Sequence, residues 1–270
     1  MNYLDSLESR SIYIIREAYK QFRNIAMLWS IGKDSTSLLW LCRKAFYGNI
    51  PFPVMHIDTS YKFKEIYDFR DRMVKEWGLK LVIARNDDAI KNGMGPKNKL
   101  SCCTELKTNA LKQIIAKHGY KALLLGIRRD EHGIRSKERY FSPRDEQFQW
   151  NYKDQPPELW DQFKNRNEGE THIRVHPMLH WTELDIWKYV QREGIPMVSL
   201  YLARKHPDGV MRRYRSIGCE TCCNPIVSEA DTVDKIVAEL EVTKIAERSG
   251  RAQDKEQAYM MQKLRSLGYM

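Results

Sequence analysis

The sequence lacks long apolar segments. Among its 270 residues, no run approaches the roughly 20 consecutive apolar residues that a membrane-spanning helix needs. The first 20 residues alternate apolar and charged side chains at helical spacing and contain no apolar core of a secretory signal peptide. These absences predict a cytoplasmic protein that acts without a membrane partner.

Internal repeats, low-complexity segments and long blocks of lysine and arginine are also absent. The formal net charge is nevertheless +10, which favours anionic ligands such as nucleotides, sulfate or nucleic acid. Because basic and acidic residues are interleaved along the chain, the charge permits a nucleic-acid partner but does not require one.

The phosphate-binding motif G-x-x-x-x-G-K-[ST] is missing, but residues 30–36 form a different loop, SIGKDST. An apolar run at 25–29 leads into it and a helical pattern leads out, which predicts a strand, a tight glycine turn and a helix. In that geometry backbone N–H groups and the helix dipole attract phosphate. Lys33 adds a full positive charge, and Ser30 and Ser35 add hydroxyl donors. The alternative is a polar helix start with an accidental lysine.

Apolar strands alternate with amphipathic helices over most of the chain. Strands are expected at residues 25–29, 53–58, 79–84, 122–125 and 173–177, and helices at 3–23, 34–46, 62–77, 102–118, 183–192, 228–248 and 253–267. This alternation predicts a doubly wound α/β fold with a mostly parallel sheet. We predict an ATP-binding domain over residues 1–200, in which 140–170 form an aromatic insert, and a C-terminal extension of loops and helices over 201–270.

Polar residues follow several of the predicted strands. Ligands of parallel sheets bind beyond the carboxyl ends of the strands, so the loop, Asp58 and the stretch beginning at Gly126 should converge. Asp58 is expected to contact the nucleotide or a magnesium ion, or else to cap the next turn. Arg128 and Arg129 suit sulfate or phosphate oxygens through their forked guanidinium groups, or else lie in a solvated loop.

Five of the six cysteines fall in two groups, Cys102-Cys103 and the run CETCC that begins at Cys219. In a cytoplasmic chain they are not a disulfide framework. The Cys219-x-x-Cys222 spacing is typical of a half-site for zinc or an iron–sulfur cluster, with Cys102 and Cys103 as further ligands. Burial as apolar residues is the alternative. Cys102 and Cys103 are expected to begin a helix, whose dipole would lower the pKa of their thiols.

Several stretches resemble the small, ATP-binding subunit of bacterial sulfate adenylyltransferase, within the phosphoadenylyl-sulfate reductase family of ATP pyrophosphatases. The matching stretches are WSIGKDS (29–35), PFPVMHIDT (51–59), YDFRD (67–71), RRDE (128–131), PELW (157–160), WTELDIW (181–187) and ERSGR (247–251). They run across nearly the whole chain, so the resemblance extends well beyond the phosphate loop.

The resemblance implies that ATP and sulfate react to give adenylyl sulfate and pyrophosphate, with ATP and Mg²⁺ as cofactors. It implies that the loop holds the β- and γ-phosphates through Ser30, Gly32, Lys33, Asp34 and Ser35. It also places Asp58 and Gly126 beside the nucleotide, and Arg128 and Arg129 against sulfate. The family couples this unfavourable reaction to GTP hydrolysis in a larger partner. Since this chain has no GTPase motif, that partner is expected to be a separate protein.

Two features depart from this pattern. The segment between Ala203 and Arg212 is shorter than expected, and the paired cysteines are typical of family members that carry a [4Fe–4S] cluster. Reductases of the family use a cysteine near the C-terminus, and none follows Cys223 here. The alternative function is therefore an iron–sulfur sulfurtransferase or reductase-like enzyme acting on another acceptor, such as nucleic acid. A third is a nucleotide-binding regulatory subunit without catalysis.

Overall fold

The structure is a computed structural model that describes residues 2–153, 155, 157–163, 170–245 and 247. Its α-helices are α1 (Tyr3–Phe22), α2 (Lys33–Ala45), α3 (Lys64–Glu76), α4 (Asp87–Lys91), α5 (Lys99–Cys103), α6 (Ala110–His118), α7 (Glu183–Glu193) and α8 (Val233–Val242). Its strands are β1 (Ile25–Leu28), β2 (Val54–Ile57), β3 (Leu81–Ala84), β4 (Ala122–Leu124), β5 (Phe141–Asp145), β6 (Glu170–Val175), β7 (Arg204–Lys205), β8 (Met211–Arg213) and β9 (Ile226–Val227). Short turns of other helix types are η1 (Thr104–Asn109), η2 (Gly133–Lys137), η3 (Leu159–Asp161), η4 (Ser199–Tyr201) and η5 (Glu220–Cys222).

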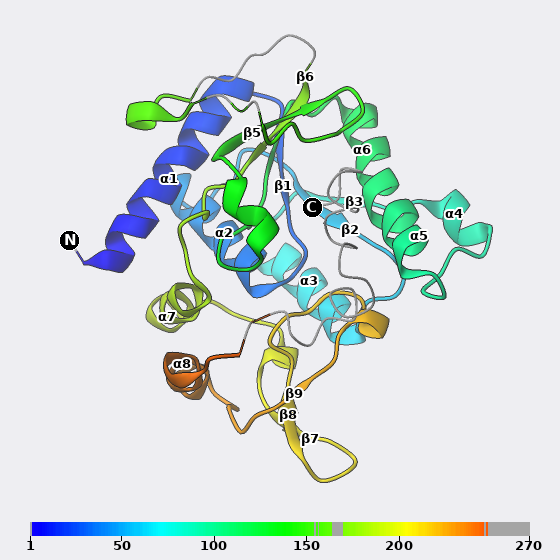
Figure 1. The fold of residues 1–270 in the computed structure, drawn as a ribbon, viewed down its shortest axis with the longest axis vertical. Helices are drawn as coiled ribbons and strands as arrows, with labels where there is room; N and C mark the ends of the chain where they lie inside the picture. Colours follow the sequence, from blue (N-terminus) through cyan, green and yellow to red (C-terminus); the bar gives the residue numbers. More distant parts are fainter. Residues whose placement is uncertain (1, 154, 156, 164–169, 246, 248–270) are drawn as a thin grey trace.

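The main sheet has six strands in the order β3-β2-β1-β4-β6-β5. All neighbouring strands are parallel except β5, which pairs antiparallel with β6. Helices cover the sheet on opposite sides, with α1 on one side and α6 on the other (Figure 1). The predicted α/β class and mostly parallel sheet are therefore confirmed.

The strand order creates a switch point between β1 and β4. The chain runs outward from β1 through β2 to β3, and then returns to β4 on the other side of β1. Met27 of β1 pairs with Leu124 of β4, so the loops that follow these strands begin side by side and then diverge. Ligands of open α/β sheets bind in the crevice at such a point.

A single cluster of buried apolar side chains runs from α1 to α8. Cys42 of α2 is fully buried in it, as expected, and burial raises the pKa of its thiol. The cluster includes Ile236 of α8, so the C-terminal extension shares the core of the sheet domain. The boundary at residue 200 remains a prediction. In the described part of the chain, no helix is long and apolar enough to cross a membrane.

Several elements differ from the expectations. The helix expected at 102–118 starts earlier, at the Asn98 cap. It consists of three consecutive pieces, α5, the π-helical η1 and α6. The helix expected at 228–248 is the shorter α8, capped by Thr232. Helix α7 begins with a capping box between Thr182 and Asp185. The helix expected at 253–267 lies outside the described residues.

Candidate functional site

The phosphate loop joins β1 to α2 through a left-handed residue that is not glycine. Ile31 is fully buried and has a φ of +67°, whereas Gly32, the N-cap of α2, has a φ of −72°. The expected glycine turn is therefore wrong in detail. A β-branched residue in this region costs about 1–2 kcal/mol. Backbone strain of this kind clusters at ligand-binding loops.

Side chains from inside and outside the loop hold its shape. Ser30 Oγ lies 3.0 Å from Ser35 Oγ, and Ser35 Oγ also donates to the carbonyl of Gly32 at 3.1 Å. The backbone N–H of Lys33 donates to the hydroxyl of Tyr201 at 2.8 Å. Tyr201 comes from η4, far along the chain, so the C-terminal half helps to set the loop.

Gly126 allows the end of β4 to pack against the start of α2. A Cβ atom on Gly126 would lie 2.9 Å from the carbonyl carbon of Asp34 and 3.0 Å from the backbone nitrogen of Ser35. Backbone cannot yield to such contacts as a flexible side chain can. Gly126 was predicted as a nucleotide-binding residue. In the structure, its missing side chain lets the backbone after β4 approach the backbone of Asp34 and Ser35 at the switch point.

Two cations and three carboxylates form a buried network at the loop. Lys33 Nζ pairs with Asp34 at 3.2 Å and with Glu247. The Arg128 guanidinium pairs with Asp34, with Glu247, and with Asp130 at 2.9 Å. Both cations are almost completely buried. The loop therefore concentrates positive charge that is balanced by internal acids.

Burial and charge act in opposite directions on the pKa values of this network. Burial alone would lower the pKa of Arg128, but the carboxylates of Glu247 and Asp130 raise it above its usual value. Burial alone would raise the pKa of Glu247, but Arg128 and Lys33 bring it far below its usual range. Arg128 and Glu247 are therefore both ionised near neutral pH.

Glu247 is the member of this network that residue-by-residue reasoning missed. It lies 214 positions from Lys33 in the sequence, in a stretch that carried family resemblance but no assigned role. No local pattern marks a lone glutamate as the partner of a distant loop. The only available signal was its place in the ERSGR stretch.

Arg129 points away from the site that Arg128 faces. Its guanidinium hydrogen-bonds to the ring of His180 and donates to the carbonyl of Glu138 at 2.8 Å. Burial lowers the pKa of His180, and the charge of Arg129 lowers it further. In this structure the Arg129 guanidinium is therefore not oriented for the predicted contact with sulfate.

Asp58 ends β2 as expected, and its carboxylate closes the following turn. Its Oδ1 accepts hydrogen bonds from the backbone N–H of Ser60 at 2.8 Å and from the hydroxyl of Tyr67 at 2.7 Å. Arg85 lies 3.6 Å from Oδ2. Burial opposes ionisation, but these contacts hold the pKa of Asp58 below its usual value. This arrangement matches the turn-capping alternative.

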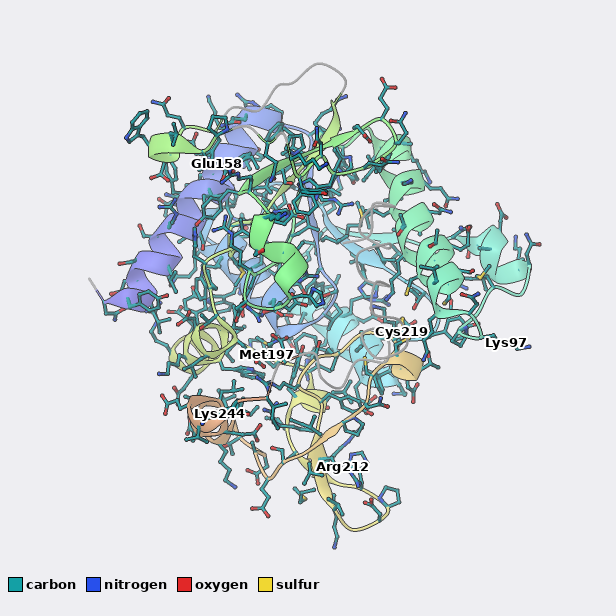
Figure 2. The ribbon with its side chains drawn as sticks, viewed as in Figure 1. Lys97, Glu158, Met197, Arg212, Cys219 and Lys244 are labelled. Atoms are coloured by element: carbon teal, nitrogen blue, oxygen red, sulfur yellow. The ribbon has the colours of Figure 1, made fainter. Side chains whose placement is uncertain are left out.

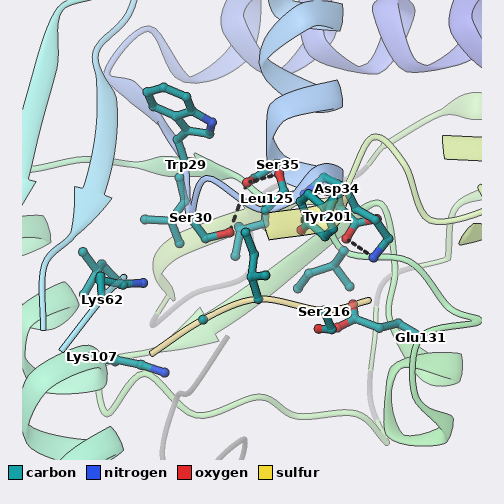
Figure 3. A pocket seen from close by; sticks show the side chains of 18 of the residues that line it. Trp29, Ser30, Asp34, Ser35, Lys62, Lys107, Leu125, Glu131, Tyr201 and Ser216 are labelled. Atoms are coloured by element: carbon teal, nitrogen blue, oxygen red, sulfur yellow. Dashed lines mark hydrogen bonds and ion pairs between the residues drawn. The ribbon is translucent and has the colours of Figure 1, made fainter. Parts of the chain in front are cut away.

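A pocket opens between the phosphate loop and the end of β4 (Figure 3). Its polar lining from the described residues comprises Ser30, Lys33, Asp34, Ser35, Lys62, Lys107, Glu131, Arg135, Tyr201 and Ser216. Lys62 and Lys107 lie together on one wall, across the pocket from Asp34 and Glu131 (Figure 3). Lys107 lies in the π-helical turn η1, an irregularity frequent at functional sites. Sequence reasoning did not single out these two lysines.

The predicted metal-binding cysteines gather beside this pocket. Cys102, Cys103, Cys219 and Cys222 are all buried, on α5 and at η5. Residues 219–220 pair with residues 61–62, in the chain that follows β2 (Figure 2 labels Cys219). The charges of the other three thiols add to the effect of burial on Cys102, so the four lie within electrostatic range of one another.

The expected activation of these thiols is wrong. Cys102 and Cys103 end α5 instead of beginning it. Burial, with smaller contributions from the other thiols, raises the pKa of Cys102 to about 12, and burial also raises that of Cys222. Among the described residues, no group of three or more His, Cys, Asp or Glu side chains is arranged to hold a metal ion. The thiols gather, but within the described part of the chain they do not form a ready metal site.

The family is decided by comparison with known proteins. Residues 24–225 match the model of the phosphoadenosine phosphosulfate reductase domain. The chain belongs to this family. Over its full length it is 42% identical to sulfate adenylyltransferase subunit 2 of Colwellia psychrerythraea, of which the match covers 99%. Identity is also 42%, again over the whole chain, to the subunit 2 of Saccharophagus degradans, with 98% of that protein covered.

Solved structures share the fold of this chain at low sequence identity. The phosphoadenylyl-sulfate reductase of Candida auris superposes with a TM-score of 0.56 and 17% identity, covering 83% of this chain and 96% of that one. The FMN adenylyltransferase of Candida glabrata in complex with ATP gives 0.57 and 18%, covering 93% and 88%. These similarities support the architecture alone.

Proposed function

We propose that this member of the phosphoadenosine phosphosulfate reductase family adenylylates sulfate, converting ATP and sulfate to adenylyl sulfate and pyrophosphate. The observation that carries the proposal is the full-length match to proteins named sulfate adenylyltransferase subunit 2. The charged phosphate loop at the switch point of the sheet is consistent with it.

Binding of ATP would place its β- and γ-phosphates over the start of α2. Lys33 supplies charge, and the loop residues Ser30, Gly32, Asp34 and Ser35 shape the cradle. A sulfate oxygen then attacks the α-phosphorus as the bond to the bridging oxygen of pyrophosphate breaks. Catalysis comes from positioning and charge neutralisation, without a covalent protein intermediate.

Sulfate needs cations near the α-phosphate. Arg128 remains a candidate because its guanidinium faces the loop, whereas Arg129 is directed to His180. Lys62 and Lys107 line the pocket and are better placed than Arg129 to meet a second anion. We therefore add these two lysines to the sulfate-binding candidates.

Several finer features remain part of the proposal. The name subunit 2 belongs to relatives that work in an assembly, and we propose a separate GTPase subunit as the partner of this chain. Mg²⁺ would arrive with the nucleotide and neutralise phosphate charge, and Asp34 and Glu131 are the carboxylates in the described pocket lining. We retain a cytoplasmic location as a prediction.

The direct test is sulfate-dependent exchange of labelled pyrophosphate into ATP by the purified chain, with and without a GTPase subunit. Exchange that requires sulfate is expected. Absence of exchange in the presence of the partner would reject sulfate activation. ATP binding without exchange under any condition would favour the non-catalytic regulatory subunit.

The gathering of four buried thiols at the pocket favours a second candidate, an iron–sulfur sulfurtransferase that adenylates another acceptor, such as nucleic acid. It predicts a brown protein with charge-transfer absorption after anaerobic purification, and about four iron atoms per chain for a [4Fe–4S] cluster. A colourless, iron-free and fully active preparation would remove this candidate.

A further inference from the structure

The C-terminal part of the described chain returns a carboxylate to the phosphate loop. Helix α8 ends at Val242, and five residues later the carboxylate of Glu247 accepts hydrogen bonds from Lys33 Nζ and from the Arg128 guanidinium. The side chain of Glu247 is 6% exposed. Its two oxygens therefore make the charge-assisted contacts that oxygens of a nucleotide phosphate would make with the same two cations.

The approach to Glu247 is held by polar contacts and little packing. The carbonyl oxygen of Ile245 accepts a hydrogen bond from Arg215 at 2.7 Å, and Arg215 is itself paired with Glu183 at the start of α7. Among the described residues, Val242 is 79% exposed and Ile245 65% exposed, so their side chains contribute little to the core. Release of the stretch would therefore expose little additional apolar surface.

The network also explains why an anion is needed there when no nucleotide is bound. Lys33 and Arg128 are buried, and a buried charge without a partner is costly. Asp34 contacts both cations, whereas Asp130, with a side chain that is 34% exposed, pairs with Arg128 alone. Glu247 is more buried than either of them and gives both cations a second carboxylate partner. ATP phosphates would supply more negative charge at the same place.

We propose that Glu247 is an internal competitor of the ATP phosphates, which neutralises Lys33 and Arg128 until the nucleotide displaces it. The inference rests on the proposed use of this loop for ATP. Lys33 lines the cavity beside the loop, and displacement of Glu247 would free its ammonium group to meet a phosphate there. Return of the carboxylate as pyrophosphate leaves would favour product release.

The test compares the wild-type protein with Glu247→Gln and with the control Glu241→Gln. Glu241 is an acid of the same segment, but it pairs with Lys188 on the surface, with its side chain 50% exposed. A competitor that occupies the site nine-tenths of the time weakens the apparent affinity about tenfold. Calorimetry should therefore give an about tenfold lower Kd for ATP and for pyrophosphate in Glu247→Gln, with Glu241→Gln unchanged.

The outcomes separate this inference from the proposed function. Equal ATP affinity in all three proteins, or weaker binding in Glu247→Gln together with a lower kcat, would mean that Glu247 only positions Arg128, and would overturn the inference while leaving ATP use intact. No ATP binding by any of the three would reject both. Amide hydrogen exchange of the wild type gives a second readout, independent of any variant. ATP should speed exchange at residues 243–245 and slow it in the loop at 30–36, and slower exchange at both would contradict displacement.

Discussion

The phosphate loop and the four-cysteine group border the same pocket, but different physics holds each in place. The loop is one contiguous stretch, residues 30–36, whose buried charges are balanced by ion pairs. The cysteine group joins two stretches that are far apart in sequence, and burial raises the pKa of the Cys102 and Cys222 thiols. The loop therefore already carries the positive charges that bind an anion. The thiols, by contrast, must first lose their protons before they can act as nucleophiles or metal ligands.

Removal of Lys33 should give the largest effect. The change Lys33→Ala deletes a full charge from the phosphate cradle, and we expect pyrophosphate exchange to fall about 10³-fold or more. Circular dichroism should remain native, because Arg128 still partners Asp34 and Glu247. The control is Lys64→Ala, whose side chain is 85% exposed. Retained exchange in Lys33→Ala would mean that the loop is not the phosphate site.

The cysteine side of the comparison predicts slow thiol chemistry. With its pKa raised from 9.0 to about 12, Cys102 should carry about a thousandfold less thiolate at pH 8 than an unperturbed thiol. Alkylation by iodoacetamide, followed by peptide mass spectrometry, should therefore be slow in the metal-free native protein and fast after unfolding in guanidinium chloride. Rapid native alkylation of Cys102 would show that the thiolate is stabilised by something other than its protein neighbours.

Gly126 tests how closely the loop depends on β4. Because a Cβ at this position meets the backbone of Asp34 and Ser35 within about 3 Å, Gly126→Ala must displace one strand end or the other. We expect the free energy of unfolding to fall by about 1–3 kcal/mol, with weaker ATP binding. Gly133→Ala is the matched control, since a Cβ there meets nothing within 4 Å. Similar denaturant midpoints for the two variants would contradict the close packing.

The sequence-based prediction succeeded where short-range patterns determine the structure. The apolar strands, the capping box at Thr182 and the strand–loop–helix at residues 25–45 follow from local periodicity and capping chemistry. Strand β5 was missed because Pro143 and charged residues interrupt the alternation of apolar and polar side chains that marks a strand. The strand is instead held by its antiparallel pairing with β6. The left-handed Ile31 contradicts local preference and is imposed by its surroundings.

For the site, the sequence identified the loop but not its charge balance. Lys33, Asp34 and Arg128 are adjacent to recognisable strand ends, so their convergence follows from the rules of parallel sheets. Tertiary packing brings Lys107 to the pocket and Glu247 to Lys33, and no local pattern encodes such contacts. The same limit applies to Arg129, because its neighbour in sequence faces the loop while it faces His180.

Asp58 lies between the two regions and should give the smallest effect. Its carboxylate caps a turn whose Thr59 hydroxyl lies 3.2 Å from Cys219 Sγ. The change Asp58→Asn keeps an acceptor for Ser60 but removes the charge, so we expect a loss of about 0.5–1 kcal/mol in the free energy of unfolding. Because the folded pKa of Asp58 is lowered, its contribution is present at neutral pH and is lost as the pH falls below about 4. The difference in unfolding free energy between wild type and variant should therefore shrink in acid.

If Asp58 only caps the turn, the Kd for ATP should not change, whereas a severalfold rise in Kd would place this carboxylate at the nucleotide or its magnesium ion.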